Sequence, residues 1–285
     1  MSSVILATKN LNYLYSKGTS SQIHAIRDIN VQIEKGELVG IIGHTGSGKS
    51  TLIQHFNGLL KGTSGVVELE GKDIWADKSK IRNVRFRVGV CFQYPEYQLF
   101  EETVEKDIAF GPRNMGLPAE EVSERVRRAA EFAKVPPEVM SRSPFDLSGG
   151  QKRRVALAGV IAMSPEFLVL DEPAAGLDPG SRRFILGGIK EYRKKSGTSV
   201  IIVSHSMEDM ASYCDRIIVM ANGRVVMDGS CAEVFSRSLE LIGIGLDVPQ
   251  VTRIASALED RGIDIGRDVY TVGYAADMID SLGKA

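Results

Sequence analysis

The stretch Gly43-His44-Thr45-Gly46-Ser47-Gly48-Lys49-Ser50-Thr51 decides the fold of this chain. Gly43 and Gly48 have four residues between them, and Lys49 and Ser50 follow Gly48, which is the spacing of a phosphate-binding P-loop. In such a loop the backbone N–H groups turn towards a phosphate, and the next helix places its positive end beside it. Lys49 is then placed to reach the terminal phosphates, and the Ser50 hydroxyl to ligate Mg²⁺. The alternative is a glycine-rich turn without a ligand.

The residues on either side predict the strand–loop–helix context that a P-loop requires. Residues 38–42 (Leu-Val-Gly-Ile-Ile) form an apolar run typical of a buried strand, and residues 52–57 predict a helix. Further apolar runs at 88–92, 167–170 and 199–203 have the composition of central strands in a parallel sheet. We therefore predict an α/β fold of the P-loop type, built on a mostly parallel core sheet.

The composition excludes several classes of protein. The 285 residues carry a formal net charge of −1, which predicts no general attraction to nucleic acid, so we expect no nucleic-acid partner. No apolar run approaches about eighteen residues and no signal-peptide pattern opens the chain, so we expect no membrane span. Cys91, Cys214 and Cys231 are scattered and only four histidines occur, which favours a reduced cytosolic protein over a disulfide framework or zinc site.

The pattern of elements predicts two parts of unequal size. Residues 4–8 and 25–33 read as strands, and a mostly helical segment covers about 100–160, with its clearest helix at 119–134. Asn222-Gly223 between two apolar runs predicts a hairpin. We expect a nucleotide-binding P-loop domain over 1–236 and a small helical extension over 237–285, whose short helices need another surface to pack against, on the main domain or on a partner subunit.

Two acidic residues end the apolar run at 167–170. A carboxylate at the tip of a strand beside a P-loop can hold Mg²⁺, so we assign Asp171 to the metal. Glu172 points differently and is assigned to an attacking water as its general base. The alternative is that Asp171 and Glu172 cap the N-terminus of a helix.

Gln93 and His205 also follow apolar strands. In a parallel sheet such strand ends gather at one edge, where ligands bind. Taken alone, each is more often a plain loop residue, but the other motifs reverse that preference. We therefore assign Gln93 to Mg²⁺ or the attacking water and His205 to the γ-phosphate. Tyr13 and Tyr15 precede a polar loop, where an aromatic ring can stack on a nucleotide base; the alternative is two ordinary strand residues.

The segment Leu147-Ser148-Gly149-Gly150-Gln151 precedes a second predicted helix over 151–162. A serine and two glycines at a helix start form a second anion site. One nucleotide needs only one P-loop, so the second site makes sense if it closes on a nucleotide held by another copy. That arrangement requires a head-to-tail dimer with two composite sites. Asp178, followed by Pro179, has the pattern of a helix N-cap.

Taken in order, these motifs resemble the nucleotide-binding domain of the ABC ATPases, over about residues 4–236. The motifs that carry the resemblance are Gly43 to Thr51, Gln93, Leu147 to Gln151, Leu168 to Glu172, Ala175 to Asp178, and His205. The resemblance implies ATP and Mg²⁺ as cofactors, an antiparallel β subdomain and a helical signature subdomain. It implies that ATP lies between the P-loop of one subunit and the signature of the other, at residues 148–151. Ser148 and Gly150 then contact the γ-phosphate, and Asp178 lies in the loop that communicates across the dimer.

A narrower resemblance is to the ATPases of energy-coupling-factor transporters. It is carried by residues 92–100 (Phe-Gln-Tyr-Pro-Glu-Tyr-Gln-Leu-Phe), by 107–112 and by 244–249, while 172–179 and Tyr97 resemble the second of two A-type paralogues. It implies a second ATPase subunit, a membrane T subunit received near Gln93, and an S subunit that binds a vitamin or Ni²⁺/Co²⁺. The chain would then lie peripherally on the cytoplasmic face of the membrane. Tyr15 is the better match to the adenine-stacking position. Ala174 stands where many relatives have Thr or Ser.

Three other functions fit part of this pattern. One is the ATPase of an ordinary ABC importer, and another is an ABC ATPase that acts on DNA or ribosomes. The third is a regulatory subunit that binds nucleotide without hydrolysing it. Residues 92–100 and the tail argue against the first, the absence of long insertions against the second, and Glu172 and His205 against the third.

Overall fold

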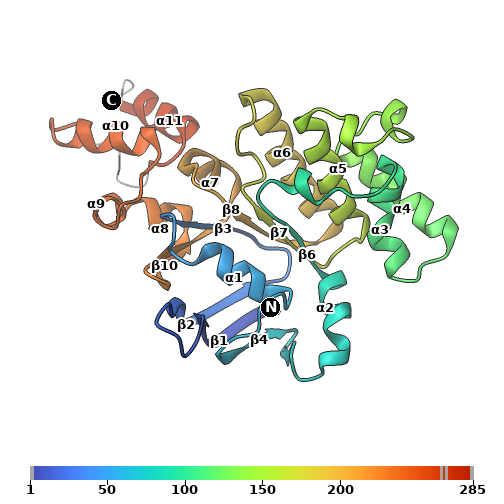
Figure 1. The fold of residues 1–285 in the computed structure, drawn as a ribbon. Coiled ribbons are helices and arrows are strands. Elements are labelled where there is room, and N and C mark those ends of the chain that lie inside the picture. Colours follow the sequence, from blue (N-terminus) through green and yellow to red (C-terminus); the bar gives the residue numbers. More distant parts are fainter. Residues whose placement is uncertain (1–2, 264–265, 267–268, 283–285) are drawn as a thin grey trace.

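Two β-sheets organise the computed structural model, which describes residues 3–263, 266 and 269–282 (Figure 1). The larger sheet has six strands in the order β10-β9-β3-β8-β7-β6, and the smaller sheet has four in the order β2-β1-β4-β5. Every neighbouring pair in the larger sheet is parallel except β9 and β10. The prediction of an α/β fold with a mostly parallel core sheet is confirmed.

The strands of the larger sheet are mostly short and apolar. They are β3 (Leu38–Gly43), β6 (Val88–Cys91), β7 (Phe167–Asp171), β8 (Ser199–Val203), β9 (Arg216–Ala221) and β10 (Arg224–Ser230). Every residue of β3, β6, β7 and β8 is buried, which explains their unbroken apolar runs, because both faces of the sheet are covered. The predicted hairpin at Asn222-Gly223 is confirmed, since both residues have positive φ and join β9 to β10.

The smaller sheet is antiparallel. Its strands are β1 (Val4–Tyr15), β2 (Ile23–Glu34), β4 (Ser64–Leu69) and β5 (Lys72–Asp73). The first two are longer than predicted from the sequence, which indicated only 4–8 and 25–33. Register shifts after Thr8 and left-handed residues at Asn10 and Asp28 break the alternation of side chains, and so hide the true strand lengths.

The helical segment between β6 and β7 packs its apolar faces together. Its helices are α3 (Val104–Asn114), α4 (Ala119–Phe132) and α5 (Gly149–Ala162), with 3₁₀ turns η2 (Pro95–Gln98), η3 (Pro137–Val139) and η4 (Pro144–Asp146). The predicted apolar stripe of α4, which includes Val126 and Ala129, is buried against α3 and α5. The other helices are α1 (Lys49–Phe56), α2 (Ile81–Arg87), α6 (Pro179–Ser196) and α7 (Met207–Tyr213), with η1 (Lys78–Lys80) beside α2.

The chain beyond β10 is helical. It forms α8 (Cys231–Phe235), α9 (Ser238–Gly243), α10 (Gln250–Glu259) and α11 (Val272–Leu282), which Figure 1 draws in orange and red next to α7. The helices predicted near 251–258 and 274–282 are confirmed, whereas α9 was not foreseen. Leu246 and Val248 are buried in the same core cluster as Met207 and Met210 of α7. This part of the tail therefore packs on the main core.

The cysteines and the helices bear on what the composition led us to expect. Cys91, Cys214 and Cys231 are all buried and free. Among residues 3–263, 266 and 269–282, no helix combines the length and the apolar character that crossing a bilayer requires.

Candidate functional site

Five parallel strands end at one edge of the larger sheet and surround a cavity of about 720 Å³. The P-loop follows β3, Gln93 follows β6, and His205 follows β8. Asp171 is the last residue of β7 and Glu172 follows it, while Asn222 and Gly223 follow β9. All of these segments line the cavity, together with Tyr15, Ile23, His24, Ala25 and Arg27 from the antiparallel sheet. The structure thus brings into one hollow residues that the sequence distributes between positions 15 and 223.

The P-loop backbone depends on glycine at its junction with α1. Gly48 is the N-cap of α1, its φ is 102°, and an added Cβ would lie 2.6 Å from the carbonyl oxygen of Ala25. Inside the loop, the Lys49 ammonium donates hydrogen bonds to the carbonyl oxygens of Gly43 and His44 at 2.7 and 3.0 Å. Burial lowers the pKa of Lys49, and the nearby carboxylates of Glu172 and Asp171 oppose that shift. The cation is therefore held at the centre of the loop.

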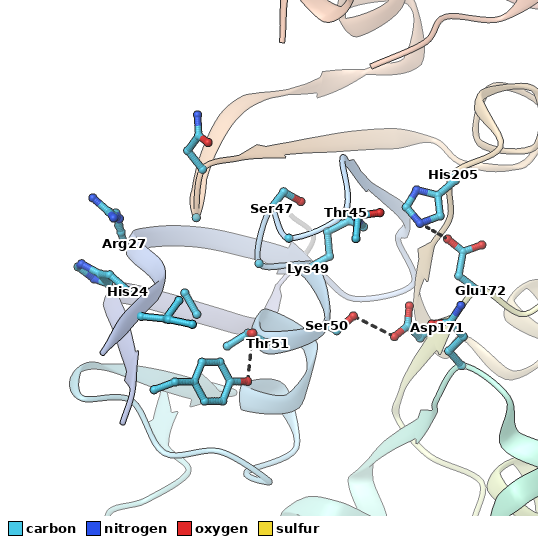
Figure 2. A pocket seen from close by; sticks show the side chains of 18 residues that line it. His24, Arg27, Thr45, Ser47, Lys49, Ser50, Thr51, Asp171, Glu172 and His205 are labelled. Atoms are coloured by element: carbon cyan, nitrogen blue, oxygen red, sulfur yellow. Dashed lines mark hydrogen bonds and ion pairs between the residues drawn. The ribbon is translucent and has the colours of Figure 1, made fainter. Parts of the chain in front are cut away.

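Ser50 and Asp171 face each other across the cavity. The Ser50 hydroxyl donates to Oδ2 of Asp171 at 3.3 Å, as Figure 2 shows. Burial raises the pKa of Asp171, while the hydrogen bond from Ser50 opposes the shift. A hydroxyl, a carboxylate and the amide of Gln93 on one cavity are hard oxygen donors of the kind that Mg²⁺ accepts. This donor set fits a Mg²⁺ ion, which is usually held by one or two carboxylates and would take its other ligands from water and substrate phosphates.

Glu172 has a backbone conformation that the sequence did not reveal. Its φ is 51°, which costs about 1–3 kcal/mol for a residue with a side chain, and its N–H donates to the carbonyl of Val203 at 2.9 Å. That bond to the end of β8 holds the strained residue in place. The alternative that Asp171 and Glu172 cap a helix is wrong, because the next helix, α6, is capped by Asp178.

The Glu172 carboxyl group lies beside His205. Its Oε1 is 3.3 Å from Nε2 of His205, as Figure 2 shows. Its Oε2 accepts a hydrogen bond from Ser204 at 3.4 Å. Burial, with a smaller contribution from the Asp171 charge, raises the pKa of Glu172 to about 7. Burial, with a smaller effect of the Lys49 charge, lowers the pKa of His205. A carboxyl group that exchanges its proton near neutral pH is suited to general acid–base chemistry.

The other end of the cavity combines a tyrosine with residues that sequence reasoning missed. The Tyr15 hydroxyl is 3.2 Å from Oγ1 of Thr51, and its ring stands edge-on to Tyr13, which packs against the core. Gly223 donates to the Ser47 carbonyl at 3.1 Å. The dipeptide Asn222-Gly223 signalled only a turn. His24 and Arg27 gave no signal at all, because nothing local indicated that they would adjoin the P-loop.

The signature segment lies outside this cavity. Ser148 is the N-cap of α5, where its hydroxyl accepts from the Gln151 N–H at 3.4 Å and its own N–H donates to the Gln151 side chain at 3.0 Å. Gly149 and Gly150 are exposed, and a Cβ added to either would meet nothing within 4 Å. Asp178, also exposed, accepts from the N–H groups of Gly180 and Ser181 at the start of α6. Within one chain, none of these five residues (Ser148, Gly149, Gly150, Gln151 and Asp178) lines the cavity.

Known proteins share both the sequence and this architecture. A sequence profile described as ABC transporter matches residues 26–175. The energy-coupling factor transporter ATP-binding protein EcfA2 of Clostridium perfringens (strain 13 / Type A) is 52% identical over 272 residues, 95% of either chain. The structure of cbiO1 from Clostridium perfringens, part of the ABC transporter complex cbiONQ, has a TM-score of 0.75 at 39% identity and covers 90% of this chain and 99% of that one.

A further similar structure contains two subunits. It is a dimeric ATP-binding cassette, MJ0796, in a post-hydrolysis state with ADP and Pi; its TM-score is 0.73 at 27% identity, covering 79% of this chain and 98% of that one. The sequence motifs, the fold and these similarities agree. The chain belongs to the ABC transporter family and, within it, to the energy-coupling factor transporter ATP-binding proteins.

Proposed function

We propose that this chain hydrolyses ATP as one half of an ATPase dimer that drives uptake through an energy-coupling factor transporter. The observation that carries the proposal is the separation of two motifs within one chain. The P-loop, Asp171, Glu172 and His205 line a single cavity, whereas the signature at residues 148–151 lies outside it, with residues 148–150 exposed. A chain built in this way needs a second chain to complete each site.

Residues 43–51 bind the phosphates of ATP in this proposal. Their backbone N–H groups and the start of α1 attract the anion, and Lys49 gives up its hydrogen bonds to the loop carbonyls when the terminal phosphates arrive. Ser50, Asp171 and Gln93 would hold Mg²⁺, which would neutralise part of the phosphate charge. Tyr15, anchored through Thr51, stacks on the adenine.

Glu172 acts as the general base. In its ionised form it accepts a proton from the attacking water, and Ser204 keeps its second oxygen in position. The lowered pKa of His205 keeps the imidazole neutral near pH 7, so that one ring nitrogen can donate a hydrogen bond to the γ-phosphate. Lys49 stabilises the charge that develops on the phosphate.

The second subunit supplies the missing contacts. Ser148, Gly149, Gly150 and Gln151 bind the γ-phosphate held by the partner subunit, and Asp178 communicates between the two sites. The dimeric similar structure with ADP and Pi supports such a partnership. Loss of the γ-phosphate removes contacts from both halves, so the dimer reopens after hydrolysis.

A membrane subunit of the T type binds at the helical segment. Exposed aromatic side chains gather around η2 and α3, namely Tyr94, Tyr97, Phe100 and Phe110. Two of these residues, Phe100 and Phe110, line a hollow of about 260 Å³ together with apolar residues of α5. In this proposal the hollow receives a helix of the T subunit. The T subunit carries an S subunit for a vitamin or for Ni²⁺/Co²⁺, and the chain stays on the cytoplasmic face.

The two parts of the chain have separate tasks in this proposal. Residues 1–236 form the ATP-binding domain, with a helical subdomain near 100–160, and residues 237–285 make subunit contacts. Exposed apolar residues of the tail, among them Leu239, Ile254 and Val272, support the second assignment. Residues 1–2, 264–265, 267–268 and 283–285 of these ranges lie outside the described residues.

Co-purification tests the proposal directly. The tagged chain is recovered from detergent-solubilised native membranes, and every protein that accompanies it is identified. Recovery of a second ATPase chain or a second copy, one T-type protein and small membrane proteins is the expected result. Recovery of a conventional permease pair would indicate an ordinary ABC importer, and recovery of soluble proteins or nucleic acid alone would refute a transport function.

A further inference from the structure

Arg153 lies where three segments meet that are far apart in the sequence. It stands near the start of α5, the helix capped by Ser148. Its Nε and Nη2 are 3.5 and 3.4 Å from the two carboxylate oxygens of Glu96 in η2. Its Nη1 donates to the carbonyl oxygen of Ala175, in the loop after β7. One planar guanidinium, which can use its donors in several directions at once, therefore joins all three segments.

The ion pair between Arg153 and Glu96 is shielded from solvent. The two side chains are 12% and 17% exposed, whereas those of the surface pair Arg127 and Glu124 on α4 are 65% and 39% exposed. Water and salt screen a surface pair almost completely, but they screen a buried pair much less. Removing one member of a shielded pair also leaves the other charge without its partner, so this pair resists disruption.

Each end of this contact adjoins a residue of the nucleotide cavity. Only two residues, Tyr94 and Pro95, separate Gln93 from Glu96. Both are conformationally restricted, because Tyr94 has a φ of 57° and the proline ring fixes the φ of Pro95. Ala175 follows Glu172 in a turn that its own N–H closes, by donating to the Glu172 carbonyl at 3.2 Å. Arg153 holds the opposite side of that turn through the Ala175 carbonyl. The Glu96–Arg153 ion pair and the hydrogen bond from Arg153 to Ala175 therefore connect η2 to the turn that carries Glu172.

We propose that Arg153 is a positioning residue that ties the Gln93 loop, the signature end of α5 and the Glu172 turn into one unit. This inference rests on the proposed function, in which a membrane subunit binds beside η2. Binding there then changes the rate of hydrolysis through Glu96, Arg153 and the Ala175 carbonyl. Neither Arg153 nor Glu96 lines the nucleotide cavity, so their effect is on the communication between sites and not on nucleotide contacts.

A double-mutant cycle tests the link. The variants are Glu96→Gln, Arg153→Gln, the double variant, and Arg153→Lys, which keeps the charge but cannot serve Glu96 and Ala175 in the same bidentate way. Phosphate release is measured for the chain alone and for its purified complex with the native membrane subunits. The ratio of the two rates is the stimulation by the membrane subunits. The exposed pair supplies the matched control, through Arg127→Gln and Glu124→Gln.

The expected result is that replacing either Glu96 or Arg153 reduces the stimulation by the membrane subunits. Glu96→Gln and Arg153→Gln each lower the ratio by about fivefold or more, within the usual range of coupling between sites. The double variant is no worse than Arg153→Gln alone, because both changes break the same link. Arg153→Lys recovers part of the ratio. The control variants keep the wild-type ratio, and all variants bind ATP as the wild type does.

Other outcomes overturn the inference. A merely structural role lowers the melting temperature and both rates in proportion, so the ratio stays at the wild-type value. Additive effects of Glu96→Gln and Arg153→Gln would show that the two residues act independently. If the wild-type chain recovers no membrane subunits, the proposed function itself fails; if the wild-type complex is stimulated and the variants match it, only the role of Arg153 fails.

Discussion

The nucleotide cavity and the signature segment of this chain are opposites in physical character. In the cavity, Lys49 and Glu172 are buried with shifted pKa values, and Glu172 keeps a strained φ. In the signature segment, Ser148 and Gln151 form a capping box, in which the side chain of each accepts a hydrogen bond from the backbone N–H of the other. The two glycines between them are exposed to solvent. In the proposed function, the cavity holds pre-organised catalytic groups, whose electrostatic interactions are stronger where water is excluded. The signature segment then acts as a recognition surface, which gains its role only against a second subunit.

Replacing Glu172 tests the catalytic side and has the largest expected effect. Glu172→Gln keeps the size of the side chain but cannot accept a proton, so hydrolysis falls by about 10²–10⁴. Phosphate release measures that loss, and gel filtration with ATP follows the dimer, which accumulates because the γ-phosphate stays in place. Glu131→Gln on the exposed face of α4 is the control. Normal turnover by Glu172→Gln would remove the role assigned to this carboxyl.

The raised pKa of Glu172 makes the cavity side sensitive to pH. The carboxyl has an ordinary pKa of 4.5 when unfolded and about 7 when folded, so between these values the folded chain binds more protons. Its stability therefore falls as pH rises from about 4.5 to 7, and the loss is complete above 7. The Glu172→Gln variant has no carboxyl to titrate at this position, so it does not lose this stability. The difference in free energy of unfolding, variant minus wild type, therefore increases by up to about 3 kcal/mol between pH 4.5 and 7.

Urea denaturation without nucleotide or Mg²⁺, at several pH values, measures that difference. The comparison uses the gap between wild type and variant at each pH, so that other titrating groups cancel. The variant Glu131→Gln again serves as the control, from a position outside the cavity. If the difference in free energy of unfolding stayed constant between pH 4.5 and 7, the cavity would not shift the pKa of Glu172. The contrast between the cavity and the signature segment would then be weaker.

A bulky change in the signature segment separates binding from hydrolysis. Ser148→Arg removes a cap from α5, at a cost of about 1 kcal/mol, and places a long side chain on the exposed surface. The cavity of the same chain is untouched, so binding of ATP to the isolated chain stays at the wild-type level. Hydrolysis falls about tenfold to a hundredfold, because charge-assisted hydrogen bonds from the partner contribute about 1.5–3 kcal/mol each.

Equilibrium dialysis with ATP and phosphate release together check this prediction. Ser148→Ala, which removes the cap without adding bulk, shows how much of the loss comes from the helix terminus alone. If Ser148→Arg weakened ATP binding to the isolated chain, the two regions would not be independent within a subunit.

Substitutions of Tyr15 have the smallest expected effect and test whether its ring stacks on the adenine at the outer end of the cavity. Tyr15→Ala removes the ring and weakens ATP binding by about two- to tenfold, in line with about 0.5–1.5 kcal/mol for aromatic stacking. Tyr15→Phe keeps the ring and loses only the contact with Thr51, so its affinity stays close to that of the wild type. Fluorescence titration with ATP distinguishes the two. Equal weakening by both variants would assign the effect to the hydroxyl, against stacking.

Many features of the site could be predicted because they depend on neighbouring residues. The P-loop spacing, the apolar strands at 38–42, 167–170 and 199–203, and the Asn222-Gly223 turn are all local patterns. The cap at Asp178 is equally local, since it joins residues two or three positions apart. Placing polar residues at the ends of parallel strands was enough to gather Gln93, Asp171 and His205.

The tertiary structure alone decided what depends on contacts between distant segments. Strand order brings Gly223 within hydrogen-bonding distance of Ser47, and the packing of the two sheets brings His24 and Arg27 to the rim of the cavity. The positive φ of Glu172 is set by its bond to Val203. The meeting of Arg153 with Glu96 and Ala175 likewise joins positions that no local pattern relates. By itself, the sequence determined which chemical groups the chain carries and which short elements form. Packing determined which of those groups meet, because burial and hydrogen bonding act between surfaces that only the folded chain brings together.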